Sequence, residues 1–109
     1  MPMDVAKSRE VLEKHVPDLE MVFNVLLWAM ESIVGSAEEC DCTRALELIE
    51  PISRTLASMR STLTKLEVER KITHEEYRLV VDTLNEAWSE SMRKAIDRFK
   101  RCGCAFRRA

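Results

Sequence analysis

Three apolar stripes with helical spacing constrain this chain more than any other feature. The first consists of Leu12, Val16, Leu19, Phe23, Leu26, Met30 and Ile33, separated alternately by four and three residues. This alternation places the side chains on one face of a helix, as in helix bundles. The second stripe is Cys42, Ala45, Ile49, Ile52, Leu56, Met59, Leu63 and Leu66. The third is Tyr77, Val81, Leu84, Trp88, Ala95, Phe99 and Cys102.

The composition agrees with long helices. The 109 residues include only two glycines and three prolines, while 46% are hydrophobic and 33% are charged. A chain of this length makes one domain. We predict an all-α fold, an up-down-up three-helix bundle of long, partly kinked helices that dimerisation completes. Residues 1–101 form the bundle domain, and residues 102–109 form a short, basic, cysteine-containing C-terminal arm.

Short polar motifs predict where the helices begin and end. Gly35 follows the first stripe and predicts a helix end, because glycine adopts the left-handed conformation found there. Ser36 and Glu39 have the spacing of a capping box that starts the second helix. Thr73 and Glu76 form a second such motif at the start of the third helix.

Two prolines lie within the helical patterns. Pro17 and Pro51 each lack a backbone donor, so each predicts a kink or a break. Both lie at similar distances from the first turn, which favours a joint bend of the first two helices. The alternative is that Pro17 begins a helix and that residues 3–15 form a separate short one. At the other end of the chain, Gly103 predicts the end of the third helix.

Four cysteines form two Cys-x-Cys pairs, Cys40 with Cys42 and Cys102 with Cys104. In an up-down-up bundle, the start of the second helix and the end of the third helix lie at the same end of the molecule. We therefore expect the two pairs to meet, although about 60 residues separate them in the sequence.

Three chemical states of the cysteines remain open. Two disulfides would connect the second and third helices, each closing a long loop worth about 4 kcal/mol. One structural zinc ion with four cysteine ligands is the alternative cofactor. Against zinc, structural sites have two to four residues between paired ligands, and residues i and i+2 of a helix point about 200° apart. The third state is four reduced cysteines, two of them filling the core.

The sequence has no recognisable signal peptide, and its longest apolar run is too short for a membrane span. We expect a cytoplasmic or virion protein with no membrane partner. Disulfides are rare in the cytosol outside hyperthermophiles. The cysteine usage and charged composition together resemble those of small helical proteins from hyperthermophilic archaea and their viruses.

Charge is unevenly distributed along the chain. Residues 1–42 contain nine acids and three bases, whereas residues 93–109 contain seven bases and one acid. This basic segment predicts phosphate contacts with a nucleic acid. Its cations are Arg93, Lys94, Arg98, Lys100, Arg101, Arg107 and Arg108. Two other interpretations are favourable cations at a helix C-terminus and pairing with the acidic first helix, within one chain or across a dimer.

The first helix carries more apolar side chains than one neighbour requires. This second row consists of Val22, Val25, Leu27, Trp28 and Val34. A helix apolar over most of its circumference is buried on several sides. We therefore expect these residues to form the interface of a homo-oligomer, preferably a dimer of six helices.

Signals of catalysis are weak. His15 and His74 lack helix-spaced partner ligands, and Glu47 with Glu50 lacks a matching carboxylate motif on another helix. There is no glycine-rich phosphate loop and no evident small-molecule substrate. We expect a non-enzymatic structural or interaction protein that self-associates. The alternative is a nucleic-acid-binding or packaging protein that uses the basic C-terminal segment.

Overall fold

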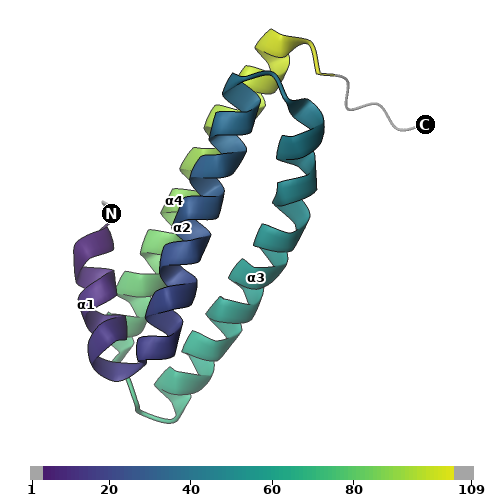
Figure 1. Ribbon diagram of the computed structural model, residues 1–109. Helices are drawn as coiled ribbons and strands as arrows, with labels where there is room; N and C mark the ends of the chain where they lie inside the picture. The colour runs from purple at the N-terminus through teal and green to yellow at the C-terminus, as the bar shows by residue number, and fades with distance from the viewer. Residues whose placement is uncertain (1–3, 105–109) are drawn as a thin grey trace.

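The computed structural model describes residues 4–104, which are all-helical with four helices and no strands (Figure 1). The helices are α1 (Val5–His15), α2 (Pro17–Glu38), α3 (Cys42–Val68) and α4 (His74–Cys102). The described part of the chain extends 47 × 27 × 21 Å. Figure 1 shows α2, α3 and α4 running up, down and up along the long axis. This part of the prediction is confirmed.

The predicted number of three helices is wrong, because the first stripe is divided between α1 and α2. The division is at Val16, whose φ of −147° and ψ of 72° are not helical. Proline disfavours the helical conformation in the residue before it and is well suited to the first helical position. The chain consequently reverses between His15 and Pro17, and α1 packs antiparallel to α2 (Figure 1).

The predicted joint bend at Pro17 and Pro51 is therefore wrong, and the alternative with a separate short helix is right. Pro51 lies inside α3, which continues as a helix on both sides of it. Its side chain is exposed, so the ring is accommodated on the solvent side of α3.

The turn between α2 and α3 also differs from its prediction. α2 continues through Gly35, and Ser36 is a buried helical residue, so the capping box predicted at Ser36 is wrong. One further helical turn places Ala37 in the core, where it is fully buried. Asp41 caps α3 instead, and its carboxylate accepts a hydrogen bond from the backbone N–H of Arg44 at 3.2 Å.

Both remaining end signals are confirmed. The Thr73 hydroxyl accepts from the Glu76 backbone N–H at 3.0 Å, and the Glu76 carboxylate accepts from the Thr73 N–H at 2.9 Å. Gly103 ends α4 with a φ of +69°.

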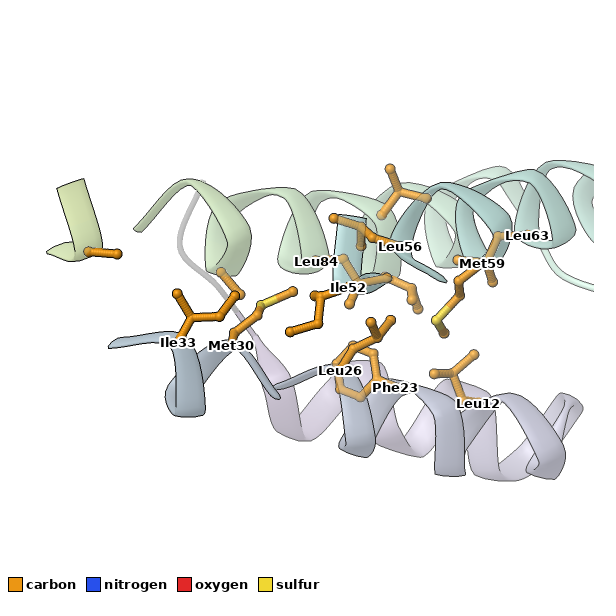
Figure 2. Packing of buried hydrophobic residues seen from close by; sticks show 14 of the residues in the cluster. Leu12, Phe23, Leu26, Met30, Ile33, Ile52, Leu56, Met59, Leu63 and Leu84 are labelled. Carbon is orange, nitrogen blue, oxygen red and sulfur yellow. The ribbon is translucent and has the colours of Figure 1, made fainter. Parts of the chain in front are cut away.

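The core lies between α2, α3 and α4, with α1 covering its lower end (Figure 1). Figure 2 shows the larger apolar side chains converging from these helices. They include Leu12, Phe23, Leu26, Met30, Ile33, Ile52, Leu56, Met59, Leu63 and Leu84. All belong to the three predicted stripes, so the stripe positions locate the centre of the bundle.

Candidate functional site

The four cysteines meet at the end of the molecule where α2 turns into α3 and α4 ends. Cys40 is joined to Cys102 and Cys42 to Cys104 by disulfides, with Cα–Cα distances of 5.5 and 6.1 Å. We call these four residues the cysteine clamp. The clamp connects Cys40 in the α2–α3 turn and Cys42 at the start of α3 to the C-terminal end of α4. The two cysteine pairs therefore meet, as predicted.

The backbone at the clamp explains how closely spaced cysteines reach the same partner segment. Cys40 lies outside both helices in the left-handed conformation, with a φ of +59°. Its N–H donates to the Ala37 carbonyl at 3.0 Å, and the Asp41 N–H donates to the Ser36 carbonyl at 2.8 Å. This is the hydrogen-bond pattern of a Schellman motif, which usually places glycine at the left-handed position. The capping box predicted at Ser36 would have placed Cys40 in the first turns of the second helix, and this turn takes its place.

The clamp stabilises the fold mainly through the unfolded chain. Each disulfide spans 62 residues of sequence. Closing one loop of that length is worth about 4 kcal/mol in the chain-entropy model. The second bridge then closes only a small additional ring, so its contribution is smaller.

Most of the described cations of the basic segment form ion pairs with acids of α4 itself. Arg93 and Lys94 both pair with Glu90, at 2.7 and 3.9 Å, and Arg101 pairs with Asp97 at 3.4 Å. These are contacts between neighbouring turns of one helix. The predicted pairing of these cations with acids of the first helix does not occur among the described residues of this chain.

Arg98 has a different environment from the other cations. Its guanidinium donates to the backbone carbonyl of Glu38 at 3.1 Å, across the contact between α4 and the end of α2. The carbonyl is one of those that a helix C-terminus leaves without an intrahelical partner. Lys100 is exposed and borders an apolar groove. Arg107 and Arg108 lie outside the described residues.

The predicted oligomer interface is divided between covered and uncovered positions. Val22 and Leu27 are half-buried against the core, and Val34 is half-buried as well. Val25 and Trp28 are exposed, at 55% and 69% of their surface. Met21 also belongs with these two residues, since it lies one turn before Val25 and is 69% exposed. We call Met21, Val25 and Trp28 the α2 face.

A second uncovered apolar surface lies between α3 and α4. It is a groove of about 260 Å³, lined by Leu46, Ile49, Met92, Ile96, Phe99 and Lys100. Leu46 and Ile96 are 44% and 46% exposed. We call it the α3/α4 groove. Sequence reasoning missed Met21, Leu46 and Ile96, because spacing shows that a side chain is apolar but not whether a neighbouring helix covers it.

The two apolar surfaces lie on opposite sides of the long helices. The α2 face points away from Phe23, Leu26 and Met30, which enter the core from the same helix. In an arrangement of three helices, the outer side of one helix lies opposite the groove between the other two. α1 packs against α2 and α4 at the lower end of the molecule, and its Val5 and Arg9 line a pocket with Trp28, which stays 69% exposed.

Both histidines lie within hydrogen-bonding distance of a glutamate, and Glu50 pairs with an arginine. His15 lies 3.0 Å from Glu76, and His74 lies 2.6 Å from Glu67. Glu50 pairs with Arg54 on the same helix. In the oxidised form, residues 4–104 contain no group of three or more side chains placed to hold a metal ion.

The composition of α2 is compatible with a membrane span as well as with the core of a bundle. By length and composition alone it is long and apolar enough to cross a membrane, the one such helix in residues 4–104. This is a weak sign, because the central helix of a bundle has the same composition, and α2 packs against all three other helices. Only 28% of its most apolar window is buried, so one chain alone leaves much of α2 uncovered.

No protein-family model, curated protein or solved structure matches this chain. The clamp and the two apolar surfaces are the features of the molecule that bear on its function.

Proposed function

We propose that the protein is a non-enzymatic assembly protein, in which the α2 face of one copy occupies the α3/α4 groove of a second copy. The observation that carries this proposal is the α2 face itself. It presents three large apolar side chains, each more than half exposed, on the central helix of the bundle. Exposed apolar groups arranged contiguously in a small protein mark an interaction surface.

The shapes of the two surfaces are complementary. Met21, Val25 and Trp28 follow one another at intervals of four and three residues, so they form a single ridge along α2. The groove between α3 and α4 is apolar along its walls and has room for one large side chain. Tryptophan is the residue type most often found as the central anchor of such contacts.

The charges around the two surfaces favour the same pairing. Asp18 and Glu31 lie three residues beyond each end of the α2 face, and α2 contains no lysine or arginine. Lys100 lines the groove and lies four residues after Ile96. An α2 face in the groove therefore places an acid of α2 near a base. Two α2 faces against each other bring the acids of both α2 helices together, with Arg9 of α1 and Lys94 of α4 bordering Trp28 beside them.

The proposed contact joins different surfaces of the two copies, so it is head-to-tail. Such contacts form a closed ring when the rotation between neighbouring copies adds up to a full turn, and an open chain when it does not. The pairing of Arg93, Lys94 and Arg101 with acids of their own helix supports an assembly role over nucleic-acid binding. Cations already paired on their own helix offer less net charge to phosphates.

The proposal is tested by sedimentation velocity of the oxidised protein over a range of concentrations. We expect the wild type to associate and Trp28→Glu to sediment as a monomer. Loss of a buried tryptophan anchor typically costs about 2 kcal/mol or more, which raises Kd roughly 30-fold.

The matched control is Val68→Glu. Val68 is 77% exposed and lies at the end of α3, outside both apolar surfaces. Val68→Glu is expected to associate like the wild type. A wild type that remains monomeric up to millimolar concentration, or equal association of the Trp28→Glu and Val68→Glu variants, would contradict the proposal.

A further inference from the structure

The cysteine clamp gathers four sulfur atoms from two short segments, residues 40–42 and 102–104. The two disulfides link these segments side by side. The Cys42 sulfur also lies 3.7 Å from the carbonyl oxygen of Cys40, so the two bridges are close neighbours. A connection between α4 and the α2–α3 turn needs only one bridge. Four cysteines in this arrangement equal the ligand number of a tetrahedral thiolate site.

The main geometric argument against such a site does not apply to this backbone. Two cysteines separated by one residue point about 200° apart when both lie in a helix. Cys40 is in the left-handed conformation, and Cys42 is the first residue of α3. On the other segment, Cys104 follows Gly103, which has a φ of +69°. Each pair therefore crosses a helix end, and both of its sulfurs reach the opposite segment.

The surroundings of the clamp suit a negatively charged group. Cys42 is at the N-terminus of the 27-residue helix α3, where the backbone favours negative charge. The Arg98 guanidinium donates to the Glu38 carbonyl, and the Cys102 sulfur lies 3.6 Å from the neighbouring Ala37 carbonyl. Arg98 and the Cys102 sulfur thus contact consecutive carbonyls at the C-terminal end of α2.

We propose that the reduced cysteine clamp is a binding site for one thiophilic divalent cation, Zn²⁺ being the physiological choice. Two equivalents of a small dithiol reductant break the two S–S bonds, supplying four electrons and four protons and becoming cyclic disulfides. The four thiols then bind Zn²⁺ and release four protons, which leaves a tetrathiolate complex of net charge −2. The ligands are Cys40, Cys42, Cys102 and Cys104.

With this site, the clamp has an oxidised form and a metal-bound form, and both connect the same two segments of the chain. Disulfides hold α4 to the α2–α3 turn under oxidising conditions, and zinc holds it under reducing conditions. Helix α4 is then cross-linked to the α2–α3 turn in either environment. In a reducing compartment, where disulfides are rare, the metal provides this cross-link.

The test uses the full chain, reduced anaerobically with a phosphine, which takes one water per disulfide and becomes the phosphine oxide, and titrated with Co²⁺ as the spectroscopic probe. We expect one equivalent of Co²⁺ to produce thiolate-to-metal charge-transfer absorption and the visible bands of tetrahedral cobalt, and Zn²⁺ to displace it. Removing one pair by Cys42→Ser with Cys104→Ser leaves two thiols. This variant is expected to bind at least about 100-fold more weakly, because loss of an outer-shell partner alone costs up to that factor.

His74→Ala is the control, since His74 lies at the opposite end of α4 from the clamp. It is expected to bind like the wild type. Circular dichroism of the reduced protein before and after metal addition accompanies each titration, and metal-driven recovery of helix counts as binding coupled to folding. Less than one equivalent bound by the reduced wild type, or equal binding by the wild type and the double-serine variant, would overturn the proposal.

Discussion

At the scale of single residues, the ends of the helices are fixed by a few polar side chains. Thr73 and Glu76 satisfy each other's backbone N–H groups at the start of α4. Glu76 also lies 3.0 Å from His15, the last residue of α1. One carboxylate therefore both caps α4 and attaches the end of α1 to it.

The protonation of Glu76 is expected to affect stability at low pH. The hydrogen bond from the Thr73 backbone N–H is the largest influence on the pKa of Glu76 and lowers it. Burial acts in the opposite direction, and the contact with His15 lowers the pKa further, so that the net shift is downward. A carboxylate with a lowered pKa in the folded state stabilises the fold above its ordinary pKa. That contribution is lost as the pH falls through the lowered value.

Glu76→Gln should therefore reduce the free energy of unfolding at pH 7, and the difference from the wild type should shrink as the pH falls below about 4. Urea denaturation at several pH values measures this difference. Glu75→Gln, an exposed neighbour in the same turn, is the control and should have a smaller effect at pH 7. The same deficit for Glu76→Gln at pH 3 and pH 7 would contradict the assignment.

At the scale of helices, α1 is attached to α4 by a buried polar contact as well as by Leu12. The Ser8 hydroxyl donates to the Thr83 hydroxyl at 3.2 Å, and both residues are almost completely buried. The Asp4 backbone N–H donates to the same Thr83 oxygen at 3.3 Å. Thr83 thus satisfies two donors at the N-terminal end of α1.

Thr83→Val keeps the side-chain shape but removes the acceptor of both bonds. Because a buried donor without a partner costs about 1–3 kcal/mol, we expect a loss of that size in the free energy of unfolding. Adding Ser8→Ala should recover part of the loss, since it removes one of the two stranded donors. Urea denaturation of the two single variants and the double variant tests this, and strictly additive losses would show that the two hydroxyls do not interact.

The sequence predicted the helices better than the turns between them. The stripes identified the core of α3 and α4, and the Thr73 capping box located the start of α4, because these signals are local. The break at Pro17 was ambiguous in the sequence. Whether a proline starts a helix or bends one depends on where the preceding helix packs. The helix end predicted at Gly35 was wrong because Ala37 is buried in the core, and this burial extends α2 beyond the glycine.

At the scale of the whole molecule, topology accounts for the clamp. Three antiparallel helices bring the start of α3 and the end of α4 together, so the meeting of the cysteines followed from the helix order. The order in which the sulfurs pair, and the left-handed Cys40, depend on the hydrogen bonds of the turn. The exposed surfaces were less predictable. Val25 and Trp28 were expected at an interface, but the α3/α4 groove exists only once the helices are packed.

The head-to-tail contact between the α2 face and the α3/α4 groove is the central claim, and one mixing experiment tests it directly. Trp28→Glu removes the α2 face but keeps the groove, whereas Ile96→Glu alters the groove but keeps the α2 face. Each variant alone should be monomeric in sedimentation velocity. An equimolar mixture should form a one-to-one dimer that grows no further, because only one compatible pair of surfaces remains. If Ile96→Glu alone still associates, or if the mixture stays monomeric, the head-to-tail contact is wrong.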